Sequence, residues 1–421
     1  MKAFCISDFS ALIGIDWADQ KHDVCELVVG NDPPVHLSTI ASRPEAIHKW
    51  VMGLRMHHEN KPIAVACELK KGPLIYALLK YEFITIFPLH PATVAKMRKA
   101  FHPSGAKSDP ADAQLQAELL RDYMHKLTPI VPDSPAVRAL AQLVECRRKL
   151  VQDRVDLTNS LTYYLKNYFP QVLDWFNEKD SHVFCDFIAK WPSLERVQRA
   201  RKKTLVDFMH QHNVRIADVI EQRLTNIKLA MPLTEDEGVV VPNQLMAELE
   251  ANQLKVLLES IECIEKEINK RYRAMADRKI FDSFPGAGPQ LAPRLLVAFG
   301  SERSRYESAS AMQRYAGIAP VVESSGTRSW THWRYACPKF LRQTFVEWAG
   351  QTVRYSFWAR AYYNQQKAKG KAHNTIIRSL AFKWIRIMFR CWKDRTPYDE
   401  SKYLEALKER GSPLLKFAVK T

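Results

Sequence analysis

At 421 residues the chain is too long for one ordinary hydrophobic core, and we expect two or three domains. A hydrophobic content of 46% and an aromatic content of 10% exclude a disordered chain, and no apolar run is long enough to cross a membrane. The net charge of +16 falls almost wholly on residues 276–421, which carry 26 Lys and Arg against 11 Asp and Glu, as a phosphate-binding surface requires.

The N-terminus and the cysteines bear on the cellular compartment. Asp8 and Asp16 come before any apolar segment long enough for a signal peptide, which argues against export. The eight cysteines form no CxxC pair and no group at zinc-ligand spacing, so we expect reduced and mostly buried thiols. Both observations favour a cytoplasmic protein.

The first third of the chain has a strand pattern first and a helical pattern later. Three segments at hairpin spacing predict an antiparallel meander, and the segments after them alternate between helix and strand. The expected strands are 11–18, 21–30, 34–40, 62–69 and 83–89, and the expected helices are 44–58 and 73–81. This order is typical of a ribonuclease H-like (RuvC-like) sheet, although other α/β folds share it. We therefore expect an α/β domain over residues 1–130.

Four carboxylates in this domain lie at predicted strand ends and in the first turn of a predicted helix, where they could bind metal ions. Asp16 ends the first strand, and Glu68 ends the fourth on a face otherwise made of alanine. Asp109 and Asp112 lie on one side of the first turn of a helix that begins near Ser108. An aspartate within an apolar strand is costly to bury unless it is paired or bound to a cation. Such a set can hold two Mg²⁺ ions that act on phosphate.

Three of the four carboxylates also have a plain structural interpretation. Asp109 before proline can simply cap the helix, and Asp112 in the first turn complements the helix dipole. Glu68 can be a solvated strand end. Asp16 is the hardest to explain this way, and the four together in a basic protein favour the metal site.

The middle of the chain is dominated by two long helical runs. Prolines and serines between positions 129 and 135 mark a boundary, after which a helical pattern continues to Phe169. The apolar positions of the second run step by three and four residues, as in a coiled-coil seam: Leu254, Leu257, Ile261, Ile264 and Ile268. Because the seam is narrow and flanked by charge, we slightly favour a partner chain over an internal hairpin. We expect residues 131–275 to form a helical coiled-coil linker and oligomerisation region, with a flexible loop over 235–242.

The last third is expected to be a mainly helical, basic domain over residues 276–421. It opens with Gly286 and Gly288 in a turn before a helix, which exposes backbone N–H groups to a DNA phosphate but also occurs in ordinary connectors. A Ser-Ser-Gly turn with Ser324 and Ser325 then precedes a basic run. The side chains expected to bind nucleic acid are Arg328, His332, Arg334, Lys339, Arg342, Arg378, Lys383 and Arg386. A basic surface that only confers solubility is the alternative.

Two features of this domain are ambiguous from the residues alone. The helix over 373–394 interleaves cations with the aromatic residues Phe382, Trp384, Phe389 and Trp392, which fits stacking on nucleic acid and equally fits an amphipathic core helix. A serine hydroxyl attacks phosphate only when its proton is removed and the developing charge is met by cations or metal. Arginines near the Ser-Ser-Gly turn and the acidic domain could meet both needs, and a plain turn is the alternative.

Taken together, these segments resemble the RNA-guided insertion-sequence transposases, also called bridge-RNA recombinases, and the related Piv invertases. The resemblance rests on GIDWA with Asp16, ACE with Glu68, and KSDPADA with Asp109 and Asp112, which match the DEDD motif of that family in order and spacing. It covers most of the chain and is weak over residues 180–240 and after Trp392.

The resemblance implies a serine nucleophile that precedes a glycine and joins covalently to DNA. Ser325 matches it best, and Ser324 is the competing position. It also implies an acidic domain that completes the site, a structured guide RNA that selects donor and target double-stranded DNA, and a homo-oligomer of two to four copies. We therefore expect a multidomain α/β plus α protein that acts as a DNA transposase or site-specific recombinase.

Two other functions remain open from the sequence. One is a ribonuclease H-fold nuclease or Holliday-junction resolvase that hydrolyses DNA with water and without a covalent step. The other is a non-catalytic protein that binds RNA or DNA with the same fold. The presence of all four carboxylates argues against the second.

Overall fold

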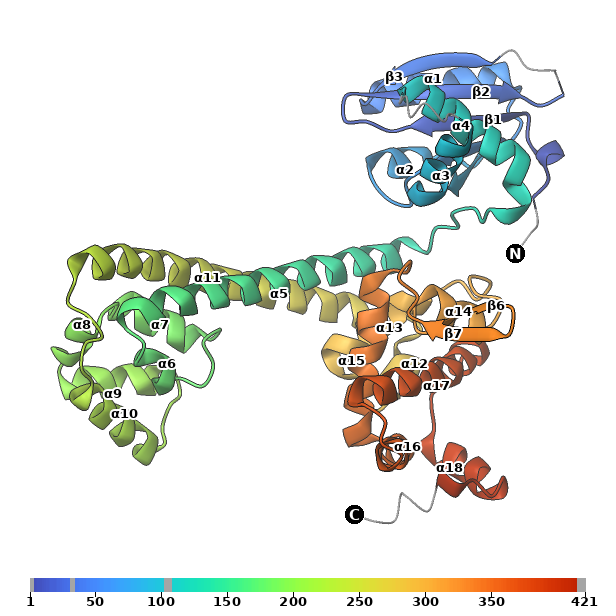
Figure 1. The fold of residues 1–421 in the computed structure, drawn as a ribbon. Helices are drawn as coiled ribbons and strands as arrows, with labels where there is room; N and C mark the ends of the chain where they lie inside the picture. Colours follow the sequence, from blue (N-terminus) through green and yellow to red (C-terminus); the bar gives the residue numbers. More distant parts are fainter. Residues whose placement is uncertain (1–3, 31–34, 102–107, 415–421) are drawn as a thin grey trace. The chain divides into compact units, whose positions relative to one another are not determined.

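The computed structural model of the chain describes residues 4–30, 35–101 and 108–414. It divides into two compact units, Met1–Asp133 and Ser134–Thr421 (Figure 1). The first unit contains a five-stranded sheet, and the second is helical apart from one hairpin. This confirms the α/β part and the mainly helical part, while a separate middle domain stays a prediction. Among the described residues, no helix is long and apolar enough to span a bilayer.

A five-stranded sheet forms the centre of the first unit. Its strands are β1 (Ala11–Asp16), β2 (Lys21–Val28), β3 (His36–Ala41), β4 (Ile63–Cys67) and β5 (Ile84–Pro88), in the spatial order β3-β2-β1-β4-β5. The first three strands are antiparallel, and β4 and β5 run parallel to β1. The predicted meander followed by alternation is confirmed. Residue 34, the expected start of the third strand, lies outside the described residues.

Helices cover both faces of this sheet. They are α1 (Pro44–His57), α2 (Pro73–Leu78), α3 (Pro91–Phe101) and α4 (Asp109–Tyr123). One face packs its apolar side chains against α1 and α2, and the other packs against α3 and α4. The sequence did not predict α3. Its described residues bury only Val94, so the apolar periodicity that identifies a helix is missing there.

Gly14 is the point where α4 lies closest to the sheet. A side-chain carbon at this position would overlap the carbonyl oxygen of Ala113 and come within 2.5 Å of the backbone nitrogen of Ala117. Only glycine leaves room for such an approach of backbone to backbone. Because α4 also contacts β2 and β4, this contact fixes the helix across the middle of the sheet.

Two long antiparallel helices form the frame of the second unit, α5 (Pro135–Tyr168) and α11 (Glu237–Arg273) (Figure 1). Leu254, Ile261 and Ile268 of the predicted seam are buried, and the other two seam positions are half-buried. Leu254 and Ile268 share their cores with buried side chains of α5, so the preference for a partner chain is wrong at these two positions. Helices of the same chain, chiefly α5, pack along α11.

The flexible loop predicted over residues 235–242 is wrong, because α11 begins within this segment. The helix begins at Glu237, and the carboxylate of Asp236 accepts a hydrogen bond of 2.8 Å from the N–H of Gly238. This cap satisfies an otherwise free backbone donor. Pro242 therefore lies inside the helix, where sequence rules place a boundary.

Short helices pack at one end of the long pair. They are α6 (Val172–Trp175), α7 (His182–Lys190), α8 (Leu194–Gln198), α9 (Lys202–Gln211) and α10 (Ala217–Leu229). Aromatic residues dominate their shared core, in which Phe187 contacts both Trp191 and Phe208. This cluster occupies the region that the sequence left unassigned.

The other end of the pair carries the basic part of the chain. Its helices are α12 (Arg278–Asp282), α13 (Gly288–Phe299), α14 (Ala309–Tyr315), α15 (Lys339–Tyr355), α16 (Phe357–Ala368), α17 (His373–Asp394) and α18 (Glu400–Glu409), and its hairpin is β6 (Val321–Ser325) with β7 (Arg328–His332). Trp384 and Trp392 of α17 are fully buried in its core. For these two residues the core interpretation is correct, and base stacking is excluded.

Candidate functional site

Asp16 and Glu68 lie at the ends of two adjacent parallel strands. Ile15 of β1 pairs with Cys67 of β4, so the next residue on each strand comes at the same edge of the sheet. Strand alternation places both residues on the face of Gly14, which is the face that α4 covers. The two backbone positions are therefore neighbours beside α4.

The first turn of α4 carries the other two predicted carboxylates. Ser108 occupies the cap position and Asp109 is the first helical residue, so the interpretation of Asp109 as the helix cap is wrong. Asp112 directly precedes Ala113, whose carbonyl group contacts Gly14. The close approach at Gly14 therefore brings this turn of α4 alongside the end of β1.

Asp112 is the most informative of the four carboxylates. Its side chain is 3% exposed, and one oxygen, Oδ1, accepts a hydrogen bond of 2.5 Å from the Nε of Arg98 on α3. The other oxygen, Oδ2, is buried and has no hydrogen-bond partner among the described residues. An unsatisfied buried polar atom costs about 1–3 kcal/mol, and more when it is charged. A divalent cation at this oxygen would remove the cost, so the residues fit a bound metal ion.

Two polar residues that lie beside this site were not identified from the sequence. Asp23 of β2 pairs directly with Asp16, is 7% exposed, and accepts a hydrogen bond of 3.2 Å from Thr39 Oγ1. Gln116, one turn after Asp112, is fully buried, and neither its oxygen nor its nitrogen has a hydrogen-bond partner within the described chain. The signal for Asp23 was available, because it too is an aspartate inside an apolar strand.

A second group of possible metal ligands lies elsewhere in the first unit. Glu26, His57 and His58 place one ligand atom each within 4.8 Å of one another. Glu26 Oε1 and His58 Nε2 are 2.8 Å apart, as in a hydrogen-bonded pair. Nitrogen ligands suit transition metals, whereas Mg²⁺ prefers oxygen. The carboxylates near α4 are therefore the better fit for Mg²⁺.

Two cysteines of the sheet carry thiols that are not activated. Cys25 and Cys67 are buried in the sheet, and burial raises the pKa of each thiol to about 11. Such thiols stay protonated at neutral pH and do not act as nucleophiles. Of the eight cysteines, three are buried, three are half-buried and two are exposed, so the expectation of mostly buried thiols is only partly correct.

The predicted Ser-Ser-Gly turn is the tip of the β6–β7 hairpin. Ser325 pairs with Arg328 across a two-residue turn, in which Gly326 has a positive φ of 58°. Alternation and the pairing register put Ser325 and Arg328 on one face and Ser324 on the other, opposite Ser329. Both Ser324 and Ser325 are exposed. The register thus gives Ser325 a cationic neighbour and Ser324 a neutral one.

A small hydrogen-bond network stiffens the Ser325 face of the hairpin. Glu323 accepts hydrogen bonds from Trp330 Nε1 at 3.0 Å and from His332 Nε2 at 2.7 Å. The bond to Glu323 raises the pKa of His332, and the same bond lowers the pKa of Glu323. His332 is therefore held as a charged partner of Glu323 over a wider pH range than a free imidazole.

Five of the predicted cations come together in one place beside this hairpin. His332 and Arg334, with Arg378, Lys383 and Arg386 of α17, line a groove of about 720 Å³. Arg342 lies close by, with its guanidinium carbon 5.1 Å from the Trp333 ring centre. Distant parts of the sequence thus form one basic surface, a feature that spacing along the chain could not show.

The remaining predicted binding residues lie apart from the groove lining. Gly286 has a φ of 69°, and a side-chain carbon there would come within 3.0 Å of the Tyr355 ring, so this glycine serves packing against α15. Gly288 opens α13 with a φ of 54° and open space around it. Lys339 is exposed at the start of α15.

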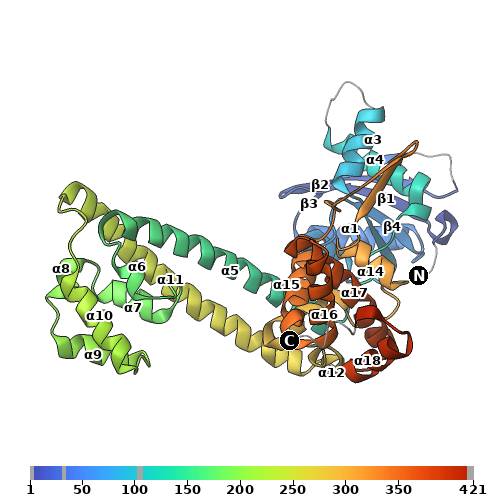
Figure 2. The ribbon, with the colours of Figure 1, turned by 60° about the horizontal axis from the view of Figure 1, so that its bottom comes forward.

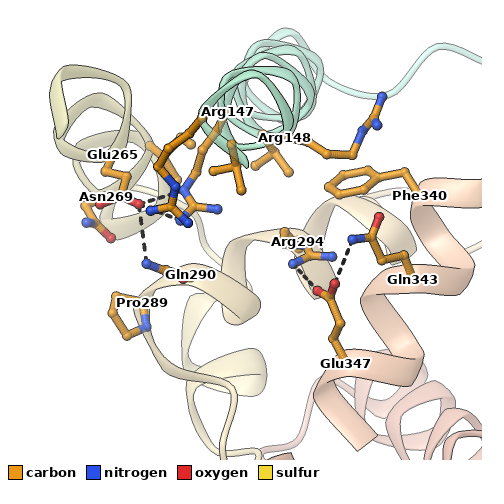
Figure 3. Close-up of a pocket in the computed structure, with 14 residues that line it drawn as sticks. Arg147, Arg148, Glu265, Asn269, Pro289, Gln290, Arg294, Phe340, Gln343 and Glu347 are labelled. Carbon is orange, nitrogen blue, oxygen red and sulfur yellow. Dashed lines mark hydrogen bonds and ion pairs between the residues drawn. The ribbon is translucent and has the colours of Figure 1, made fainter. Parts of the chain in front are cut away.

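Another cavity, of about 290 Å³, lies where α5 and α11 meet α13 and α15 (Figure 3). Four arginines line it, and each one has an acidic partner. The ion pairs are Arg147–Glu265, Arg148–Glu145, Arg154–Asp180 and Arg294–Glu347. Because its charges are balanced, we interpret this cavity as part of the junction between the long helices and the basic helices, not as an anion site.

Two family models of known proteins match segments of this chain. A DEDD-type IS110 model described as "Transposase" matches residues 13–170, and a model described as "Transposase IS116/IS110/IS902 family" matches residues 278–364. The first stretch contains all four predicted carboxylates, and the second contains the β6–β7 hairpin. Together the two matches cover more than half of the chain.

Curated relatives extend the similarity over nearly the full length. The chain is 28% identical to the candidate transposase of the IS117 mini-circle in Streptomyces coelicolor, over 92% of this chain and 95% of that protein. It is 26% identical to an uncharacterized 44.8 kDa protein of insertion element IS116 in Streptomyces clavuligerus, over 91% and 94%. It is 22% identical to an uncharacterized 42 kDa protein of IS900 in Mycobacterium paratuberculosis, over 91% and 96%. The chain therefore belongs to the IS110/IS116 family of transposases.

Proposed function

We propose that this transposase cuts and rejoins DNA with Mg²⁺ ions held beside a ribonuclease H-like sheet and with a serine nucleophile on the β6–β7 hairpin. The observation that carries the proposal is the buried oxygen of Asp112 that has no hydrogen-bond partner among the described residues, beside the strand end that bears Asp16. An unsatisfied carboxylate oxygen at this position supports the binding of a cation.

In this proposal Asp16, Glu68, Asp109 and Asp112 hold the metal, and Arg98 fixes the orientation of Asp112. When bound, two Mg²⁺ ions would neutralise charge that develops on the attacking and leaving oxygens of the phosphate. Asp23, paired with Asp16, adds negative charge at the same edge of the sheet. Neither polar atom of the Gln116 amide has a partner in the described part of the chain, and this side chain could bond a water molecule of the metal's hydration shell.

Ser325 is the proposed nucleophile. Its hydroxyl loses a proton to a base and its oxygen bonds to the phosphorus, while the bond from phosphorus to the leaving deoxyribose oxygen breaks and that oxygen takes up a proton. Attack by a deoxyribose hydroxyl of another strand on the phosphoserine would reverse these changes and rejoin the DNA. Arg328, which pairs with Ser325, meets the negative charge of the phosphate.

The covalent step is tested with a matched pair of serine variants. We expect wild type and Ser324→Ala to form a denaturation-resistant protein–DNA adduct on element-end DNA with Mg²⁺, and Ser325→Ala to form none. DNA binding should be similar in all three proteins, because removing one exposed hydroxyl takes away no charge. Nicked ends without an adduct in wild type would favour hydrolysis by water, and an intact adduct in Ser325→Ala would reject this nucleophile.

The metal site is tested by activity and by direct metal binding. Asp112→Asn should abolish strand cleavage and Mg²⁺ binding, whereas His58→Ala, in the separate Glu26–His57–His58 group, should leave both unchanged. Isothermal titration of the full chain with MgCl₂ measures binding without reference to activity. Equal Mg²⁺ affinity in wild type and Asp112→Asn would reject the assignment.

We further propose, on the strength of the family resemblance, a structured guide RNA and a homodimer or homotetramer that works on donor and target DNA in the cytoplasm. Sequencing of RNA that co-purifies with the protein should recover a non-coding segment encoded beside the gene. Light scattering should give a mass of two or four chains. Recombination by a monomer without RNA would overturn both parts.

A further inference from the structure

The groove beside the hairpin is lined by positively charged side chains and by no negatively charged ones among the described residues. Among the described residues that line it, none carries a carboxylate, whereas Arg334, Arg378, Lys383 and Arg386 each carry a positive charge. Among the described residues, the guanidinium of Arg334 donates to the backbone carbonyl of Ala319, at 3.4 Å, and forms no ion pair. That of Arg378 likewise donates to the carbonyl of Asn374, at 3.0 Å. Within the described chain these four cations therefore have no ion-pair partner, whereas each arginine that lines the cavity of Figure 3 has one.

The same groove also has an apolar wall. The segment Ile318–Pro320 forms one side, and Tyr362 and Phe382 from α16 and α17 contribute aromatic surface. The ammonium of Lys383 lies 5.0 Å from the centre of the Tyr362 ring. A surface that only attracts phosphate needs no such wall, because phosphate contacts are polar.

The walls are held in place before any ligand binds. Arg378 places its guanidinium carbon 3.6 Å from the centre of the Trp333 ring, which ties α17 to the segment after β7. Gln313 of α14 is buried and donates a hydrogen bond of 2.6 Å to the carbonyl of Phe382. A preformed groove loses little conformational entropy on binding.

We propose that this groove binds an unpaired stretch of DNA strand, with phosphates on Arg378, Lys383 and Arg386 and a base against Tyr362 and Phe382. A duplex keeps its bases stacked inside and would leave the apolar wall uncovered, whereas an unpaired strand presents base faces and phosphates together. The volume of about 720 Å³ is within the range of pockets that take nucleotide-sized ligands.

The position of the groove suggests what the strand is for. His332, the last residue of β7, lines the groove, and β7 pairs with the strand that ends at Ser325. An unpaired strand seated in the groove would thus lie next to the hairpin that carries the proposed nucleophile. This role, though not the binding itself, rests on the proposed function.

The test compares single-stranded with duplex DNA of the same sequence on the full-length protein, by fluorescence anisotropy over a range of salt concentrations. Arg386→Gln should weaken single-strand binding about tenfold and reduce the slope of log K against log salt by about 0.7. Duplex binding should change less than twofold. The control is Arg390→Gln, one turn further along α17 and outside the groove lining, which removes the same charge and should change neither.

The apolar wall is tested with single strands that carry the fluorescent base 2-aminopurine. Binding to the wild-type protein should change the 2-aminopurine fluorescence because the base stacks on an aromatic ring. Phe382→Leu should reduce this change. The fluorescence anisotropy should show that the variant still binds the strand and is therefore folded. Equal losses in Arg386→Gln and Arg390→Gln, or fluorescence that does not respond to binding, would overturn the proposal. A tenfold preference for RNA over DNA of the same sequence would overturn the assignment to the DNA strand. Adduct formation by wild type in the same preparations shows whether the proposed function itself holds.

Discussion

Replacing Gly14 with alanine is the change whose effect the structure determines most closely. The added methyl group would overlap the carbonyl oxygen of Ala113 and come within 2.5 Å of the nitrogen of Ala117, both of them backbone atoms that cannot rotate away. α4 must therefore move away from β1 by about 1 Å, and overpacking of this kind costs about 3 kcal/mol. For a unit of this size we expect the Tm to fall by about 10 °C.

The same displacement should remove the metal response, because Asp109 and Asp112 lie on the first turn of α4. The assay is thermal unfolding followed by circular dichroism, with and without MgCl₂ at about 10 mM, roughly ten times a millimolar Kd. Gly53→Ala is the control: Gly53 lies in α1, where the new carbon would meet nothing within 4 Å beyond its chain neighbours and its own helix backbone, and alanine there should stabilise the helix by about 0.5–1 kcal/mol. A Gly14→Ala protein that melts like wild type, or that keeps the full Mg²⁺ response, would refute this account of how α4 is positioned.

Three further changes test other parts of the structure. Asp112→Asn should leave stability without metal within about 1 kcal/mol of wild type and abolish the rise in Tm with Mg²⁺, as calorimetry can show. The pKa of His332 is raised and the pKa of Glu323 is lowered, so the ion pair is complete between their ordinary pKa values of 4.5 and 6.5. It is lost when the pH rises through the raised pKa of His332 or falls through the lowered pKa of Glu323. NMR titration should show that Glu323→Gln lowers the pKa of His332. Leu254→Ala, at a fully buried position, should cost about 2–5 kcal/mol in urea unfolding, whereas exposed Leu249→Ala should cost little.

The sequence predicts most of the first unit because its strands are strongly periodic. β1 before Asp16 and the whole of β4 are apolar, and a half-buried Asp16 at the end of such a strand has few explanations other than a charge partner or a cation. α3 was not predicted because only one of its described side chains is buried. Arg98, which lies on α3 and donates a hydrogen bond to Asp112, was therefore missed as well. Partners of this kind depend on how elements meet in space, which spacing along the chain does not encode.

In the second unit, periodicity identified the long helices but not their partner. The seam of α11 has the same pattern whether a second chain or α5 covers it, and only the packing of the folded chain distinguishes the two. The aromatic residues of α17 were ambiguous for a similar reason. Trp384 and Trp392 are core residues and Phe382 lines the groove, a division that follows from which side of α17 faces the surrounding helices.

The most direct test of the central claim is to locate the covalent bond. Wild-type protein is incubated with element-end DNA and Mg²⁺, the denatured adduct is digested with protease and nuclease, and the peptides are analysed by mass spectrometry. We predict a nucleotide phosphate attached to the side chain of Ser325, with the yield lost when Asp112 is changed to Asn. Nucleotide attached to any other residue, or cleaved DNA with no modified peptide, would contradict the account.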